Sequence, residues 1–167
     1  MAHPAATAYL GWFVHAHLRA GMTVLVGGGA GNVGTAATQI ATRAGARVVA
    51  TARKEDVDRC RRSGAVAVVD YRAADLADRV LVTAANDGDT PAPLSRLYQR
   101  DVSVVGFVIS RARVEDLVDA ARLINRMLVD GELSARIADE LPLSETEAAH
   151  RRMEAGGVSG RLLLHVG

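Results

Sequence analysis

Short continuous apolar runs alternate along the chain with stretches that are periodic at helix spacing. Residues 33–41 are one such stretch, with apolar side chains at i, i+3, i+4, i+7 and i+8, which predicts one apolar helix face. The apolar runs that predict strands are residues 23–26, 48–50, 65–69, 80–82, 102–109 and 161–166. Continuous apolar strands between amphipathic helices are typical of a parallel sheet covered on both faces, so we predict an α/β fold.

Further helices are predicted at residues 4–18, 55–63 and 114–128, and after a capping box formed by Ser144 and Glu147. Gly64 and Gly131 stand where helix-ending glycines are favoured. Apolar positions in register predict the buried face of the third of these helices: Val114, Leu117, Val118, Ala121, Ile124 and Leu128. The chain has 167 residues and shows neither a linker nor a second set of repeats, which favours a single domain over residues 1–167.

The turn after the first apolar run carries the clearest chemical signal. Gly29, Gly31 and Gly34 form a G-x-G-x-x-G motif, with Ala30, Asn32 and Val33 at the intervening positions. The first glycine allows a tight turn, the second allows a pyrophosphate to approach the backbone, and the third allows helix and strand to pack closely. The phosphates would lie on the free N–H groups of the helix N-terminus. The motif lies between a predicted strand and helix, as a dinucleotide site of the Rossmann type requires, although a merely tight turn is the alternative.

The residues after the second predicted strand indicate which dinucleotide is bound. NAD sites usually place Asp or Glu there to bind the ribose 2′-hydroxyl. This chain has Thr51, Ala52, Arg53 and Lys54 instead. Cationic side chains suit a 2′-phosphate, so NADP(H) is favoured; a solvated helix start is the alternative.

Composition argues against several classes of partner. The net charge of +1 gives no basic excess for nucleic acid. No run of 18 apolar residues and no signal-peptide pattern occurs, so we expect neither a membrane partner nor secretion, but a cytoplasmic protein. The single cysteine, Cys60, is expected to be a small core residue in a helix. His15 and His17 are two residues apart and face different sides of a helix, so no metal site is expected.

One connection is unusually short. Nine residues, 71–79, separate the third predicted strand from the apolar run at residues 80–82, whereas a parallel crossover usually takes a dozen or more. We predict that Val80–Ala84 takes the place beside Thr23–Val26, giving a shortened but continuous sheet; a strand supplied by a partner subunit is the alternative. An empty place would leave two rows of backbone groups unpaired, at about 1–3 kcal/mol each.

Several separated segments resemble the nucleotide-binding domain of zinc-independent quinone oxidoreductases (zeta-crystallin-like) of the medium-chain dehydrogenase/reductase superfamily. They are PAATAYLGWFVHAHLRAGMTVLVGGGAGNVGTAATQIATRAGARVVATAR, VVDYR, DVSVVGF and EAAHRRMEAGGVSGRLLLHV. The resemblance implies a Rossmann domain that binds NADPH for hydride transfer to a quinone, an enone or a related conjugated carbonyl.

The resemblance also implies roles for single residues. It places the pyrophosphate on residues 29–34, the 2′-phosphate on Arg53 and Lys54, and the adenosine side on Tyr71. Gly106 and Phe107 would line the nicotinamide pocket, on a strand that pairs two subunits in a homodimer. It identifies no catalytic residue in this chain.

The chain also departs from the family. The N-terminal domain that supplies most of the substrate pocket is not in the sequence, and one central βα unit is missing between residues 79 and 80. Activity is therefore expected to be reduced or to depend on a partner. A non-catalytic binding or regulatory module, and a lyase or cyclase that uses the old cofactor cleft, are the alternatives.

Overall fold

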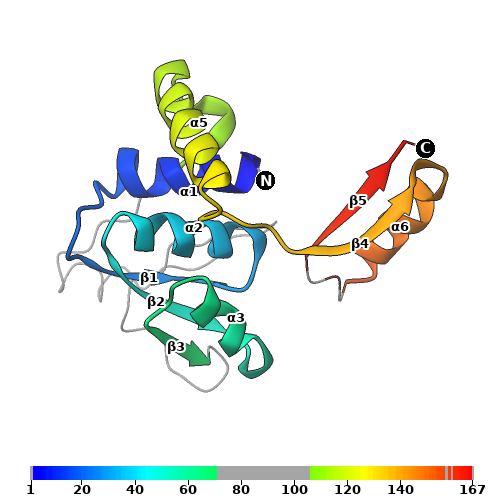
Figure 1. Cartoon of the computed structure of the whole chain (residues 1–167), viewed down its shortest axis with the longest axis horizontal. Helices are drawn as coiled ribbons and strands as arrows, with labels where there is room; N and C mark the ends of the chain where they lie inside the picture. The colour runs from blue at the N-terminus through cyan, green and yellow to red at the C-terminus, as the bar shows by residue number, and fades with distance from the viewer. Residues whose placement is uncertain (1, 71–105, 157, 159, 167) are drawn as a thin grey trace. The chain divides into compact units, whose positions relative to one another are not determined.

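The computed structural model describes residues 2–70, 106–156, 158 and 160–166. Sequence analysis expected one domain; the structure divides into two compact units, residues 1–133 and 134–167, and each is described by itself (Figure 1). Several predictions lie outside the described residues. They concern Tyr71, the short connection, the strand at residues 80–84 and the first part of the strand at residues 102–109.

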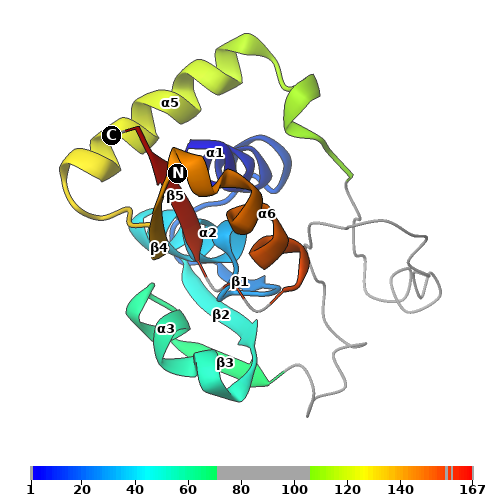
Figure 2. The same ribbon diagram turned by 90° about the vertical axis from the view of Figure 1, so that its right-hand side faces the viewer.

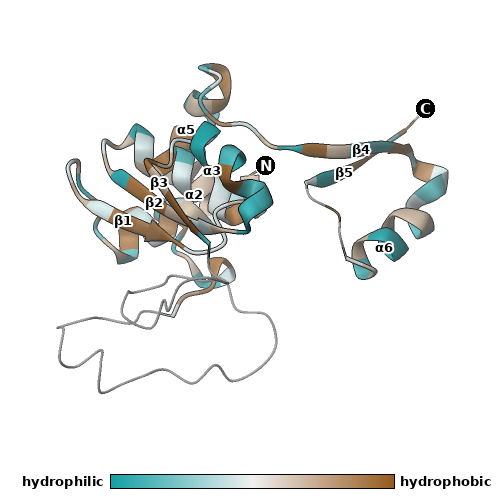
Figure 3. Cartoon of the chain, turned by 90° about the horizontal axis from the view of Figure 1, so that it is seen from below, coloured by the Kyte–Doolittle hydropathy of each residue, from teal (hydrophilic) through white to brown (hydrophobic). Residues whose placement is uncertain are grey.

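A parallel sheet forms the centre of the first unit. Its strands are β1 (Thr23–Val26), β2 (Arg47–Ala52) and β3 (Ala67–Asp70), in the order β1-β2-β3. Val26 pairs with Ala50, and Ala52 pairs with Asp70, so the carboxyl ends of all three strands lie at the same edge. In Figure 3, β1 and β3 carry mostly hydrophobic colours. The predicted α/β fold with a parallel sheet is confirmed.

Two helices with small apolar residues pack together in this unit. α1 (Ala2–Tyr9) continues into a π-helical turn η1 (Leu10–His15), and α2 (Asn32–Arg43) follows β1. The Trp12 Nε1–H donates a buried hydrogen bond of 2.9 Å to the carbonyl of Ala37, which fixes the level of one helix against the other. The larger core cluster is Ala5, Ala8, Trp12, Leu18, Val26, Ala36, Ala37, Ile40, Ala41, Ala46, Val48, Ala120, Ile124, Met127 and Leu133.

The segment after β2 also agrees with its prediction. A 3₁₀ turn η2 (Lys54–Asp56) leads into α3 (Val57–Arg62). Gly64 has φ of +107°, as a glycine that ends a helix requires. A smaller core cluster here is formed by Ala50, Ala52, Cys60 and Ala65.

The helix α5 (Val114–Val129) forms as predicted, but of the six residues predicted for its buried face only Ile124 is buried. Its buried residues are Ala120, Ile124 and Met127, whereas Val114 is 70% exposed and Val118 is 42% exposed. α5 packs against α1, where the small Ala120 side chain permits close approach (Figure 2). The elements that pack against α5, and not the widest apolar stripe in its sequence, therefore decide which face of α5 is buried.

The strand predicted at residues 102–109 is wrong in its described part. Residues 106–108 are irregular, and a 3₁₀ turn η4 (Ile109–Arg111) follows. The Phe107 ring stacks on His15 with ring centroids 4.5 Å apart. This aromatic contact places Phe107 against η1.

The second unit contains β4 (Ile137–Pro142), a 3₁₀ turn η5 (Leu143–Glu145), α6 (Thr146–Glu154) and β5 (Arg161–His165). The two strands pair in parallel. β5 was predicted and β4 was not. The capping box of Ser144 and Glu147 is wrong, because Glu145 is the N-cap without a side-chain bond and Glu147 pairs instead with Arg151.

The corrected face of α5 predicts unequal effects of two truncations. Met127→Ala removes a fully buried side chain and should lower the free energy of unfolding by about 2–5 kcal/mol. Val118→Ala is the matched control on the exposed face and should change it by less than about 0.5 kcal/mol. Chemical denaturation of both variants measures this; a larger loss from Val118→Ala would contradict the observed packing of α5.

Candidate functional site

The glycine-rich turn between β1 and α2 is tied to the carboxyl end of β2. The Gly28 N–H donates to Thr51 Oγ1 at 3.1 Å, and the Gly29 N–H donates to the Thr51 carbonyl at 2.8 Å. Within the turn, the Gly31 N–H donates to the Gly28 carbonyl at 2.9 Å. Because Thr51 precedes Arg53 by two residues, these bonds bring the turn beside the predicted 2′-phosphate residues.

The three motif glycines differ in how much space surrounds the position that a Cβ would occupy. A Cβ on Gly34 would lie 2.2 Å from the Gly28 carbonyl oxygen, and one on Gly29 would lie 2.7 Å from Ala50 Cβ. Gly29 thus packs against β2, while the left-handed conformation of the turn belongs to Gly28, with φ of +59°. This corrects the predicted role of Gly29. A Cβ on Gly31 would meet only the Gly28 carbonyl oxygen, at 3.3 Å, so its side-chain space is nearly open.

The N-terminus of α2 presents backbone donors next to this open space. Gly31 is the N-cap, and the first intrahelical bond runs from the Thr35 N–H to its carbonyl at 2.8 Å. The N–H groups of Asn32, Val33 and Gly34 therefore precede the helical ladder, and no described residue accepts from them. Gly31 and Asn32 are exposed and Val33 is half-buried, so an anion can approach the first of these donors from solvent.

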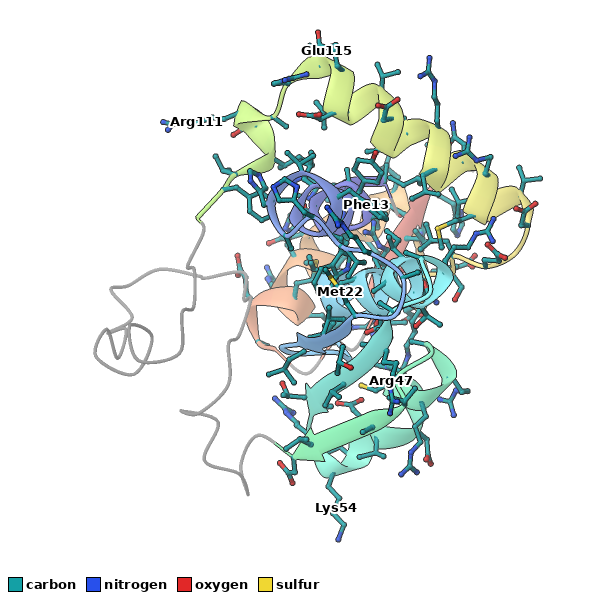
Figure 4. All side chains as sticks on the ribbon, turned by 90° about the vertical axis from the view of Figure 1, so that its left-hand side faces the viewer. Phe13, Met22, Arg47, Lys54, Arg111 and Glu115 are labelled. Carbon is teal, nitrogen blue, oxygen red and sulfur yellow. The ribbon has the colours of Figure 1, made fainter. Side chains whose placement is uncertain are left out.

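Three cationic side chains follow β2 near the turn. Arg53 and Lys54 are both exposed, and Figure 4 shows Lys54 projecting away from the body of the unit. The third, Arg59, was missed by the sequence analysis. Its Nη1 donates to the Ala30 carbonyl at 2.8 Å and lies 3.5 Å from Asp56 Oδ1. The spacing of Arg59 from the glycines in the sequence matches no known motif. Arg59 reaches the glycine turn only because α3 packs beside that turn.

Other predicted site residues are not brought to the turn. The Phe107 ring stacks on His15. His15 lies about one turn after Trp12, whose indole N–H bonds to the Ala37 carbonyl in the middle of α2. Gly106 is exposed beside Phe107 and contributes to a cavity of about 520 Å³, lined by Leu10, Val14, His15, Gly106, Phe107, Val108, Arg111, Ala112, Arg113 and Asp116. None of the residues that line this cavity belongs to the glycine turn.

Cys60 has the environment of a core residue. Its side chain is buried, and burial raises the pKa of its thiol; the Asp56 carboxylate raises that pKa further, while Arg59 opposes it. A raised pKa leaves little thiolate, so Cys60 is unsuited to act as a nucleophile. Among the residues that the structure describes, no cluster of His, Cys, Asp or Glu could hold a metal ion, and no helix is long and apolar enough to span a bilayer.

The sequence was compared with those of known proteins. No family model matches the chain. Phthioceranic/hydroxyphthioceranic acid synthase of Mycobacterium tuberculosis is 29% identical over 96% of this chain, which spans 9% of that protein. Quinone oxidoreductase of Pongo abelii is 24% identical over 96% of the chain, which spans 60% of it.

Solved structures agree with the sequence comparison. A mycobacterial quinone oxidoreductase superposes with a TM-score of 0.84 at 22% identity, covering 98% of this chain and 63% of that one. The CurK enoyl reductase superposes with a TM-score of 0.79 at 22% identity, covering 99% and 60%. The structure has the fold of these solved proteins. The predicted resemblance to quinone oxidoreductases of the medium-chain dehydrogenase/reductase superfamily is confirmed.

The alignments also show that both of these relatives are longer inside the matched region. The synthase alignment extends over 201 positions while this chain has 167 residues, so at least 34 positions of the synthase face gaps. The same comparison with the 196 positions of the quinone oxidoreductase alignment gives at least 29. The chain is shortened relative to both.

The glycine geometry predicts opposite tolerance at two motif positions. Gly34→Ala should lower the free energy of unfolding by about 3 kcal/mol, because its Cβ would collide with backbone at 2.2 Å. Gly31→Ala should cost about 1 kcal/mol or less, since its neighbour has to move only slightly. Thermal or urea denaturation of the two variants compares them; equal losses would contradict the close approach of α2 to the turn.

Proposed function

We propose that this chain binds NADPH and serves as the cofactor-binding domain of a reductase that acts on quinones or other conjugated carbonyl compounds. The observation that carries the proposal is the glycine turn, where an open Gly31 adjoins three N–H groups that no described residue occupies. A pyrophosphate could approach that backbone and accept those donors. Residues 29–34 would hold it.

NADPH is preferred over NADH on the evidence of charge. Arg53 follows β2 directly, and the Asp or Glu that an NAD site commonly uses is lacking there. The mycobacterial protein of similar fold and CurA of Vibrio vulnificus were both solved with NADPH. Arg53 is the stronger candidate for the 2′-phosphate, because Lys54 projects away from the unit. Tyr71 stays a candidate for the adenosine side.

The chemistry supplied by bound NADPH would be hydride transfer to a small-molecule substrate. The described residues of this chain can bind and orient the dinucleotide, but such a transfer also needs a substrate pocket that excludes water. The chain spans only 60% of the quinone oxidoreductase that it matches. We therefore place the rest of the substrate pocket on another domain or a partner chain.

A non-catalytic NADPH-binding module is the second candidate. The shortening by at least 29 positions relative to the quinone oxidoreductase favours it, because catalysis needs surfaces beyond the phosphate site. A homodimer and a cytoplasmic location also stay predictions. The pairing strand invoked for the homodimer lies mostly outside the described residues, and residues 106–109 do not form it.

The cofactor preference can be tested by titration. The wild-type chain should bind NADPH more tightly than NADH, and Arg53→Ala should reduce that preference by about tenfold, the equivalent of 1.4 kcal/mol. Nicotinamide fluorescence or calorimetry measures both constants. Lys54→Ala is the matched control and should change the preference less. Equal affinities in the wild type would exclude the 2′-phosphate assignment.

The pyrophosphate assignment has its own test. Gly31→Val should weaken both dinucleotides by about a hundredfold, because the side chain would fill the space through which the pyrophosphate approaches. The fold should remain, since a Cβ at Gly31 meets only one atom at 3.3 Å. Calorimetric titration with a melting curve of the same sample separates binding from stability. Unchanged affinity in a folded variant would contradict the assignment.

A further inference from the structure

Arg59 reaches across from α3 to the backbone of the glycine turn. Its Nη1 donates to the carbonyl of Ala30, the residue between the first two motif glycines, at 2.8 Å. The peptide group that joins Ala30 to Gly31 is thereby held at both ends, because its N–H donates to the Gly28 carbonyl at 2.9 Å. A peptide plane fixed at both its oxygen and its nitrogen cannot rotate without breaking two hydrogen bonds.

The position of Arg59 is itself restrained. Its guanidinium lies 3.5 Å from Asp56 one turn earlier, and the two side chains are only 16% and 27% exposed. Such a pair is screened less by solvent than a surface pair. On the same helix, Arg61 lies 3.8 Å from Asp58 with side chains 64% and 82% exposed, and no described contact links it to the turn. The two arginines thus differ in what they touch while carrying the same charge.

The held peptide immediately precedes the donors of α2. Gly31 is the N-cap, so the orientation of its peptide group sets the direction in which the chain enters the helix. We propose that Arg59 is a positioning residue that fixes the phosphate-binding turn in the conformation a dinucleotide pyrophosphate requires. This inference rests on the proposed function and adds a residue that acts through Ala30. Because NADPH and NADH share the pyrophosphate, Arg59 should serve both alike, in contrast to Arg53.

The test compares Arg59→Ala with Arg61→Ala in the full chain. Each variant is titrated with NADPH, with NADH and with adenosine 2′-monophosphate, which carries the 2′-phosphate but no pyrophosphate. Arg59→Ala should weaken both dinucleotides by about tenfold, the loss of one charge-assisted hydrogen bond. Its affinity for adenosine 2′-monophosphate should stay within twofold. Arg61→Ala should leave all three affinities within twofold, and melting curves verify that both variants are folded.

Other outcomes overturn the inference in distinct ways. Loss of NADPH binding alone would make Arg59 a ligand of the 2′-phosphate. Loss of all three ligands would show a general structural role, and equal losses in Arg61→Ala would show an effect of net charge. Unchanged dinucleotide affinities in Arg59→Ala would remove the role altogether. If the wild-type chain bound neither dinucleotide, the proposed function would fail, and the inference with it.

Discussion

The close approach of α2 to the turn that precedes it is the constraint on which the rest of the first unit depends. Gly34 lies so near the Gly28 carbonyl that a Cβ there would be 2.2 Å from its oxygen. This approach lets α2 pack against β1 and β2. It also sets the height of α2 at which the Trp12 indole bonds to the Ala37 carbonyl, so the glycine turn and the contact between η1 and α2 depend on the same absence of a side chain.

The sequence predicts the first part of the fold well because the signals there are local. A continuous apolar run, glycines at fixed spacing and an apolar helix face are each contained within a few residues, and β1, α2 and β2 formed close to their predicted positions. The same locality explains the helix-ending glycines, whose positive φ is a property of one residue. The glycine motif at residues 29–34 could be recognised in the sequence because its signal is likewise local.

Features that depend on contacts between residues far apart in the sequence could not be predicted from local sequence patterns. The buried face of α5 is selected by α1 and η1, which favour Ala120 and Met127 over the wider apolar stripe with Val114 and Val118. β4 has two adjacent acidic residues, Asp139 and Glu140, at its centre and ends on Pro142, and none of its residues is buried, so its sequence carries little strand signal. Arg59 looks like one arginine among several on α3, and only its contact with the Ala30 carbonyl distinguishes it from Arg61.

The length missing from the chain is consistent with the loss of one complete βα unit. A strand of about 5–6 residues, a helix of about 11–12 and two connections of about 4–6 each add up to about 24–30 residues. The alignments require at least 29 and at least 34 positions opposite gaps. Removing a strand together with its helix keeps the direction of the next strand, whereas removing either alone would reverse it. The hydrogen bonds described for the glycine turn all run within the turn or to residues of β2 and α3, so its geometry does not depend on such a unit.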